Sequence, residues 1–520
     1  MPISRLIVLA MLAALVVTPA RSFAQALPNI GLAQVRYRTL RATAQPDGAL
    51  KQEIDAIDKA LAEAIKTGRV GEARRLLAKG TTLLSGRPWT DVLDFAHSLV
   101  LRADRVFVDP STPYTVRIEQ IYAPALDLTS SPVARVRLRQ PPPGSGSMTG
   151  RTGAIEKDLG TFAGVARDLR ESPFVADLDL SGVPDGRHIV EVELLNGDQS
   201  LGTCSLVIEL FKGLDARLAT LVSAANVLPP EVFAAWRADL LYPDDYVHRV
   251  NGGRIEMGAF DVGREVAEAE ATLATARSGS DPFAGRTGDF ERHYLLQQAG
   301  EIMAYRLHVP RGYTGRQAWS LVVALHGLGV DENSFFTAYG KRLPVLAEER
   351  GYLVVAPLGF RVDGGYGVSL GISGQDAAQQ RKREMSEADV LAVIDLVRKQ
   401  YRVDENRVYL LGHSMGAIGT WYLGAKYADR WAALAVFSGA GRPATVAQMR
   451  QVPQLVVHGD ADATVPVEGS RAMVAEMKRL GVEHRYVEVP GGTHMDVVEP
   501  NLTAAFDFFD AHRRSKPPSH

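Results

Sequence analysis

The spacing of apolar residues changes three times along the chain. From Ile54 to Ile65 the apolar residues recur every three or four positions, and a second series of this kind follows Gly68. Such spacing places apolar side chains on one face of a helix. We therefore expect residues 27–110 to form a helical N-terminal region, with a single helical hairpin as its main feature.

Apolar and polar residues then alternate. In "ARVRLR", residues 134–139, three apolar side chains fall on one face and three arginines on the other. A period of two is typical of a strand with one buried face. Similar stretches follow, separated by turn sequences such as Asp185-Gly186. They predict a small β-sandwich over residues 111–212, similar to immunoglobulin-like or fibronectin-type modules. Helical spacing and a linker follow in residues 213–289.

Short, uninterrupted apolar runs characterise residues 290–515, and segments with helical spacing lie between them. The runs are "SLVVAL", "YLVVAP", "RVYLLG", "AALAVF" and "QLVVHG". Strands of a parallel sheet have this composition when helices cover both faces, because neither side of the strand meets water. The alternation predicts an α/β domain with a mostly parallel sheet and helices on both faces.

Two Gly-x-Ser-x-Gly pentads lie in this domain, centred on Ser369 and Ser414. Ser369 lies in a glycine-rich stretch with no strand leading into it. Ser414 stands between the apolar run "RVYLLG" and a segment with helical pattern. A serine nucleophile of this kind needs a sharp strand–turn–helix junction, where flanking glycines avoid a clash. Ser414 is therefore the candidate nucleophile, and the pentad at Ser369 is a coincidence of composition.

A serine hydroxyl needs an oriented base before it acts as a nucleophile. In folds of this class the acid and then the histidine follow the serine along the chain. His494 lies in a glycine-containing loop after the run "RYVEV", which makes it the candidate base. Asp460 and Asp462 both lie in the loop after "QLVVHG", and spacing alone leaves either one as the acid.

The turn "HGLG" after the first of these strands offers backbone donors. Its small residues allow the N–H of Leu328 to lie beside the N–H of Met415. Two such donors would stabilise the oxyanion of a tetrahedral intermediate. We expect His326 to fix this turn and His413 to pack beneath the site, so neither of them is a candidate for the chemistry.

Four stretches of this domain carry a specific combination of motifs. They are "VVALHGLG", "DENRVYLLGHSMGAIGTWYLGAKYADRWAALAVFSG", "VVHGDADATVPVEGSRAMVAEMK" and "VEVPGGTHMD". Together they resemble the α/β-hydrolase superfamily, and most closely its predicted-peptidase and carboxylesterase branch, which includes feruloyl esterases and enzymes similar to polyhydroxybutyrate depolymerases. The resemblance does not extend to residues 27–285.

The resemblance assigns roles that spacing leaves open. The acid of that family is the Asp of an HG-x-x-D-x-x-V-P pattern, which falls here on Asp462. It therefore implies Ser414 as nucleophile, Asp462 as acid and His494 as base, with the amides of Leu328 and Met415 as oxyanion donors. One position departs from the family: the second glycine often found after the pentad is Ala417 here, which is also small.

The expected activity is acyl transfer by a serine hydrolase on a small-molecule or polymeric carboxylic ester. This chemistry needs no metal or cofactor, and we find no Cys/His cluster with metal-ligand spacing. Two alternatives stay open: a serine peptidase of the prolyl-oligopeptidase type, and a binding protein on a degenerate hydrolase scaffold. We expect the loop at residues 358–375 to cover the substrate pocket, with Tyr366 as a pocket wall.

The first 26 residues predict a secretory signal peptide. Arg5 precedes an apolar run from Leu6 to Val17, and Ala24-Gln25-Ala26 forms a small-residue cleavage site. The run is too short to cross a bilayer as a helix. We expect no transmembrane segment in the mature chain, and a periplasmic or extracellular location of the bacterial type.

The charge distribution excludes a nucleic-acid-binding protein, and the cysteine content excludes a protein stabilised by internal disulfides. The 58 basic and 60 acidic residues are mixed along the chain and give a net charge of −2. A nucleic-acid-binding protein would instead show a basic patch or stripe. Cys204 is the single cysteine of the sequence, so the chain forms no intramolecular disulfide and depends on its core for stability.

Overall fold

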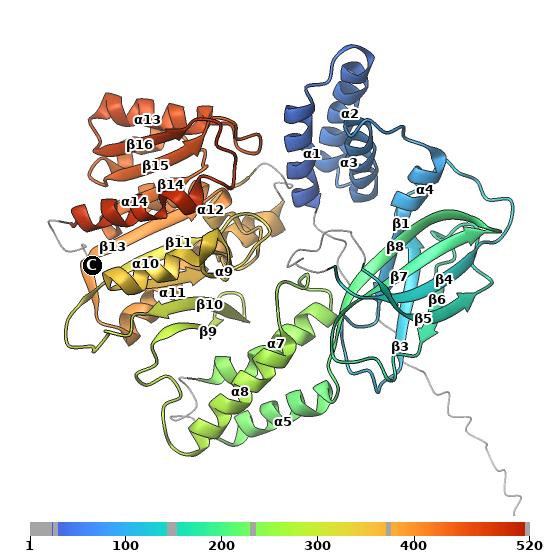
Figure 1. Ribbon diagram of the computed structural model, residues 1–520, viewed down its shortest axis with the longest axis horizontal. Coiled ribbons are helices and arrows are strands. Elements are labelled where there is room, and N and C mark those ends of the chain that lie inside the picture. The colour runs from blue at the N-terminus through green and yellow to red at the C-terminus, as the bar shows by residue number, and fades with distance from the viewer. Residues whose placement is uncertain (1–22, 24–29, 143–152, 229–235, 371–375, 515–520) are drawn as a thin grey trace, which may run out of the picture.

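The chain folds into four parts (Figure 1). They are an N-terminal helical bundle, a β-sandwich, a second helical group and a C-terminal α/β domain. The computed structural model describes Phe23 and residues 30–142, 153–228, 236–370 and 376–514. The predicted signal peptide therefore lies outside the described residues, apart from Phe23. Within the described ranges, no helix combines the length and the apolar character that crossing a membrane requires.

Three helices form the N-terminal bundle: α1 (Ile30–Ala44), α2 (Gly48–Lys66) and α3 (Val70–Leu84). Their apolar faces meet around Tyr37, Ile54 and Leu77, which are all buried. The predicted hairpin corresponds to α2 and α3. The prediction omits α1 because its buried residues are Gly31, Gln34 and Tyr37. These three residues do not form a regular series of apolar positions.

The predicted β-sandwich is confirmed. Its two sheets have the strand orders β1-β3-β6 and β2-β8-β7-β4-β5, and the inner faces share one core. The sandwich starts at β1, ahead of the predicted boundary at residue 111, since β1 and β2 are too short to show a clear alternation. The strands are β1 (Leu99–Ala103), β2 (Phe107–Val108), β3 (Tyr114–Gln120), β4 (Val133–Arg139), β5 (Ile155–Phe162), β6 (Phe174–Leu178), β7 (Gly186–Asn196) and β8 (Gln199–Leu210); α4 (Asp91–Ser98) precedes them.

The second helical group lies between the sandwich and the C-terminal domain (Figure 1). It consists of α5 (Leu214–Val227), α7 (Arg237–Asn251) and α8 (Val262–Arg277). Its core also contains Phe107 from the sandwich and Ala304 from the C-terminal domain. Because buried side chains from three parts of the chain share this core, the segment packs as a firm connection rather than a free linker.

The C-terminal domain is the predicted α/β domain. Its eight-stranded sheet has the order β16-β15-β14-β13-β11-β12-β10-β9, in which β10 runs antiparallel to both of its neighbours, β9 and β12, and the other neighbours run parallel. The strands are β9 (Gly288–Leu296), β10 (Glu301–Val309), β11 (Trp319–Leu325), β12 (Tyr352–Pro357), β13 (Val403–His413), β14 (Ala433–Phe437), β15 (Gln454–Gly459) and β16 (His484–Val489).

Helices cover both faces of this sheet. One core contains side chains of α11 (Ala377–Gln400), α12 (Met415–Lys426) and α13 (Glu468–Leu480). The other contains side chains of α10 (Arg342–Arg350) and α14 (Val498–Ala511). The central strands are buried on both sides, which explains their uninterrupted apolar sequences.

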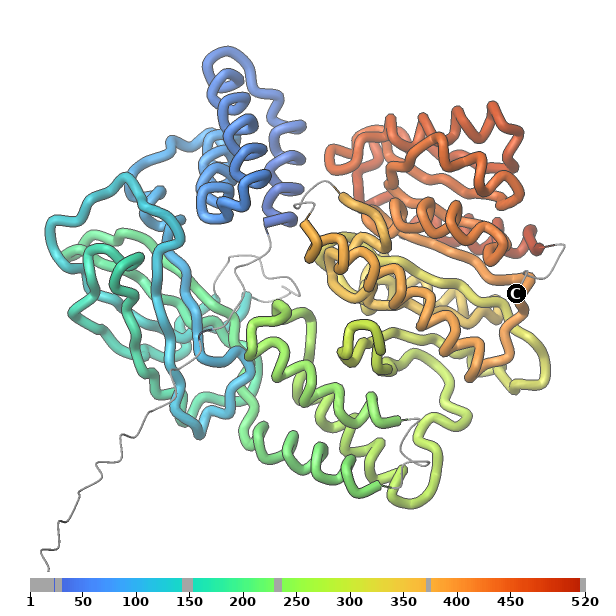
Figure 2. Tube along the Cα trace, turned by 180° about the vertical axis from the view of Figure 1, so that it is seen from behind, coloured from blue at the N-terminus to red at the C-terminus, as the bar shows by residue number. Residues whose placement is uncertain are grey.

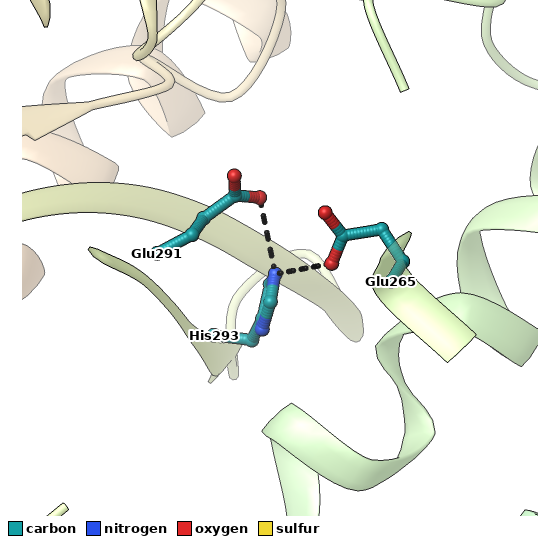
Figure 3. Close-up of side chains that lie close together, drawn as sticks. All are labelled: Glu265, Glu291 and His293. Atoms are coloured by element: carbon teal, nitrogen blue, oxygen red, sulfur yellow. Dashed lines mark hydrogen bonds and ion pairs between the residues drawn. The ribbon is translucent and has the colours of Figure 1, made fainter. Parts of the chain in front are cut away.

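A buried charged cluster joins the second helical group to the C-terminal domain. Glu265 of α8 and Glu291 of β9 both face His293, whose Nε2 lies 3.3 Å from Glu291 Oε1 and 4.0 Å from Glu265 Oε2 (Figure 3). Among the described residues this is the one group of His, Cys, Asp and Glu side chains with the spacing of metal ligands. Arg264, however, pairs with both carboxylates and already supplies their counter-charge.

We expect Glu265→Gln to reduce the loss of stability that accompanies a rise in pH from about 5 to 8. Burial, followed by the charge of Glu291, raises the pKa of Glu265 from 4.5 to about 7. The folded state therefore keeps a proton that the unfolded chain releases near pH 4.5. The stabilisation from this proton is complete below that pH and is lost as the pH rises through about 7.

The measurement is the Tm of the wild type and of Glu265→Gln at several pH values across this range. Glu268→Gln is the matched control, because Glu268 lies on the same helix and is exposed. Parallel Tm–pH curves for the wild type and Glu265→Gln would contradict the prediction.

Candidate active site

Ser414 lies at a sharp turn between β13 and α12. Its backbone has φ 58° and ψ −118°, a strained conformation for a residue with a side chain. A Cβ on Gly412 would lie 2.2 Å from the carbonyl oxygen of Gly416, and a Cβ on Gly416 would lie 1.9 Å from that of Leu325. Both glycines of the pentad are thus required by close backbone contacts. The other pentad differs, since Ser369 lies in coil with no strand before it.

The structure brings Ser414, His494 and Asp462 together from three loops. His494 Nε2 lies 2.9 Å from Ser414 Oγ, and His494 Nδ1 lies 2.7 Å from Asp462 Oδ2. The loops follow β13, β15 and β16, which run parallel and therefore end at the same edge of the sheet. Both distances are those of hydrogen bonds, so the three side chains form one continuous hydrogen-bonded series.

Asp460, the other candidate acid, forms its hydrogen bond with the backbone and not with the imidazole of His494. It is exposed, and its Oδ1 accepts a hydrogen bond from the backbone N–H of Gly491 at 2.6 Å. Gly491 lies in the loop of His494. Asp460 therefore ties the loops after β15 and β16 together, while Asp462 contacts the imidazole.

Asp462 is held in a fixed orientation as an anion. Its Oδ1 accepts hydrogen bonds from the backbone N–H groups of Thr464 and Val465, at 2.8 and 2.9 Å. Its Oδ2 lies 3.1 Å from Nε2 of His458. Burial alone would raise the pKa of Asp462, but the hydrogen bonds from His458 and His494 outweigh burial and hold the pKa well below its usual range. His458 was not among the predicted site residues, and its one signal in the sequence is its place at the end of β15, four residues before the acid.

His413 supports the loop of His494 from below, as expected. Its Nε2 lies 2.9 Å from the carbonyl oxygen of His494, and its Nδ1 lies 2.9 Å from the hydroxyl of Tyr339. Burial, with repulsion from His494, lowers the pKa of His413 to about 3, so this imidazole is neutral. It donates from Nε2 to the His494 carbonyl, which also accepts from the hydroxyl of Ser438. Tyr339 and Ser438 carry no motif that sequence reasoning could use.

The predicted oxyanion turn lies directly against the serine. A Cβ on Gly327 would sit 3.5 Å from the Cβ of Ser414. His326 is buried and fixes the turn, as expected, with its Nε2 2.7 Å from the carbonyl oxygen of Leu358. Leu328 is half-buried in this turn and Met415 is the first residue of α12. The N–H groups of these two residues stay predicted oxyanion donors.

Tyr366 lies behind the oxyanion turn. Its side chain is fully buried, and its hydroxyl donates to the carbonyl oxygen of His326 at 3.4 Å. Its ring meets the His326 ring edge to face, with centroids 5.6 Å apart. The prediction that Tyr366 lines the substrate pocket stays a prediction, and the observed contacts favour support of the turn instead.

One family match lies within this domain. Residues 297–503 match the family model described as "Putative esterase". A bifunctional acetylxylan esterase/xylanase of Neocallimastix patriciarum is 33% identical over 142 residues, which is 27% of this chain and 19% of that protein. Feruloyl esterase B of Talaromyces stipitatus is 29% identical over 143 residues, which is 27% of this chain and 36% of that protein.

This chain thus covers only about a fifth to a third of the length of these relatives. The family match nevertheless falls on the part of the chain that carries the pentad, the strand–turn–helix junction and most strands of the sheet just described. Over residues 297–503 the chain is therefore similar to esterases, and its parallel sheet with helices on both faces carries the matched segment.

Proposed function

We propose that the chain is a secreted serine hydrolase that cleaves carboxylic esters through an acyl-enzyme intermediate. The observation that carries the proposal is the hydrogen-bonded series from Ser414 Oγ through His494 to Asp462. The names of the relatives, acetylxylan esterase and feruloyl esterase, support an ester rather than an amide as substrate. Esters of small or aromatic acids are accordingly the substrates to test first.

In the proposed first half-reaction, Ser414 Oγ attacks the ester carbonyl carbon while His494 Nε2 takes the hydroxyl proton. Asp462 keeps the Nδ1–H tautomer of His494 and stabilises the imidazolium that forms. The N–H groups of Leu328 and Met415 donate to the oxyanion. When the intermediate collapses, the carbon–oxygen bond to the alcohol breaks and His494 returns the proton to the leaving alcohol.

The second half-reaction uses the same groups. His494 takes a proton from a water molecule, whose oxygen attacks the acyl carbon of the Ser414 ester. The new tetrahedral intermediate then expels Ser414 Oγ, which regains its proton from His494. The products are the free acid and an unmodified enzyme. Apart from the ester and the water, all the groups in this scheme belong to the chain, so the proposed reaction uses no metal or cofactor.

Export is proposed from the sequence. The predicted signal peptide of residues 1–26 directs the chain across a membrane, and the single cysteine leaves no disulfide to form afterwards. The periplasm or the medium is therefore the proposed location.

A serine peptidase is the second candidate, and one contact favours it. Helix α1 of the N-terminal bundle reaches the acid loop, where Thr39 Oγ1 donates to Thr464 Oγ1 at 3.3 Å. A bundle in this position would restrict the site to short peptides. The chemistry itself allows either substrate, since the same triad cleaves esters and amides.

The test is to compare p-nitrophenyl acetate with aminoacyl p-nitroanilides. We expect rapid release of p-nitrophenol and little release of p-nitroaniline, together with covalent labelling of Ser414 by a fluorophosphonate probe. Comparable kcat/KM values for the two substrate classes would favour the peptidase. A properly folded protein that neither labels nor cleaves any ester would contradict the proposed function.

A further inference from the structure

Helix α1 bridges the two loops that flank the proposed nucleophile. At its start, the methyl groups of Leu32 lie 3.6 and 3.7 Å from where a Cβ on Gly329 would be, at the end of the oxyanion turn. Further along, Thr39 is hydrogen-bonded to Thr464 in the acid loop. Figures 1 and 2, which view the molecule from opposite sides, both show α1 beside the C-terminal domain.

The bundle holds α1 firmly in this position. Tyr37 projects from α1 into the bundle core, where its hydroxyl donates to Asp58 Oδ1 at 2.8 Å. Its ring passes so close to α3 that a Cβ on Gly80 would lie 2.4 Å from a ring carbon. Because α1 is fixed by its own bundle, it presents a defined surface to the catalytic loops.

Large apolar side chains are exposed on α1 and directly after two of the proposed catalytic segments. Leu32 is 38% exposed, Val330 directly after the oxyanion turn is 44% exposed, and Met495 directly after His494 is 54% exposed. Single exposed apolar residues are common, but several beside one site are typical of a ligand-binding surface. Leu32 lies against the oxyanion turn, Val330 follows that turn, and Met495 follows the proposed base.

We propose that α1 forms one side of the substrate-binding surface and that Leu32 contacts the apolar group of the ester. The N-terminal bundle thereby selects esters with longer alkyl or aryl groups over acetyl esters. This inference rests on the proposed ester hydrolysis at Ser414 and adds to it the element that sets specificity. A longer alkyl or aryl group has apolar surface to bury against Leu32 that an acetyl group lacks.

The experiment measures kcat/KM for p-nitrophenyl acetate, butyrate and octanoate with the wild type, Leu32→Asp and Leu32→Met. We expect Leu32→Asp to lower the octanoate-to-acetate ratio by about tenfold or more, the size of effect typical of a lost apolar pocket contact. Leu32→Met keeps an apolar side chain and should preserve the ratio. A second series, acetates of alcohols of increasing length, shows whether the acyl or the alcohol group meets Leu32.

Val70→Asp is the matched control. Val70 is 39% exposed on α3, at the side of the bundle that faces the sandwich, where Gly71 lies against the Ile121 carbonyl. Val70→Asp should leave the kcat/KM ratios of both ester series unchanged. If Leu32→Asp labels with fluorophosphonate as fast as the wild type but alters neither ratio, the role of α1 is wrong. If the wild type itself fails to label, the proposed function fails, whatever α1 does.

Discussion

Ser414→Ala is expected to abolish ester hydrolysis, with kcat/KM for p-nitrophenyl acetate falling by roughly ten-thousandfold or more. The hydroxyl is the one group in the series that forms the acyl-enzyme bond, and alanine leaves His494 without a proton to accept. Fluorophosphonate labelling should disappear together with the activity. The fold should persist, because alanine fits the space of serine in the turn and the flanking glycines are unchanged.

Ser369→Ala is the matched control for this experiment. Ser369 is the centre of the other pentad, so the two variants carry the same substitution in the same five-residue pattern. We expect Ser369→Ala to keep wild-type kcat/KM and full labelling. Retained labelling in Ser414→Ala, or its loss in Ser369→Ala, would show that the wrong serine has been assigned.

The fold of the C-terminal domain could be predicted because its central strands carry their own signal. Strands such as β11 and β15 are buried on both faces, and the burial forces an uninterrupted apolar sequence. The positions of Ser414 and His494 could be predicted for a related reason. Each follows a strand of the parallel part of the sheet, and parallel strands bring their carboxyl ends to one edge.

Partners that hold the triad could not be predicted, since they depend on contacts between distant segments. Tyr339 meets His413 across 74 positions of the sequence, and Ser438 meets the His494 carbonyl across 56. Neither residue belongs to a periodic or turn pattern. Helix α1 was missed for a local reason: its buried face combines Gly31 and Gln34 with a single large side chain, Tyr37, so no regular spacing of apolar residues marks the helix.

The choice between Asp460 and Asp462 shows where spacing stops being informative. The two residues lie in one loop, and both make a hydrogen bond that links the loops after β15 and β16. Burial and the direction of the side chain separate them, since Asp462 is buried and Asp460 is exposed. Asp460 bonds to a backbone N–H, and Asp462 bonds to the imidazole. Family resemblance selected Asp462, and the observed contacts are consistent with that selection.

Asp462→Asn is expected to lower kcat by roughly ten-thousandfold, the loss seen when a triad acid becomes an amide. An asparagine amide group turned toward His494 donates to Nδ1, which moves the imidazole proton to Nε2. The proton then faces Ser414 Oγ, and the nitrogen that should accept the hydroxyl proton is blocked. The variant also loses the charge that stabilises the imidazolium, whereas the backbone bonds from Thr464 and Val465 can still hold the side chain.

Asp460→Asn makes the same chemical change two residues away. An asparagine oxygen still accepts from the N–H of Gly491, so kcat should stay within a few-fold of the wild type, because a neutral acceptor replaces a charged one at an exposed position. Measuring kcat and Tm for both variants separates chemistry from folding. If Asp460→Asn lost activity and Asp462→Asn kept it, with both proteins folded, the acid would have to be reassigned despite the contact between Asp462 and His494.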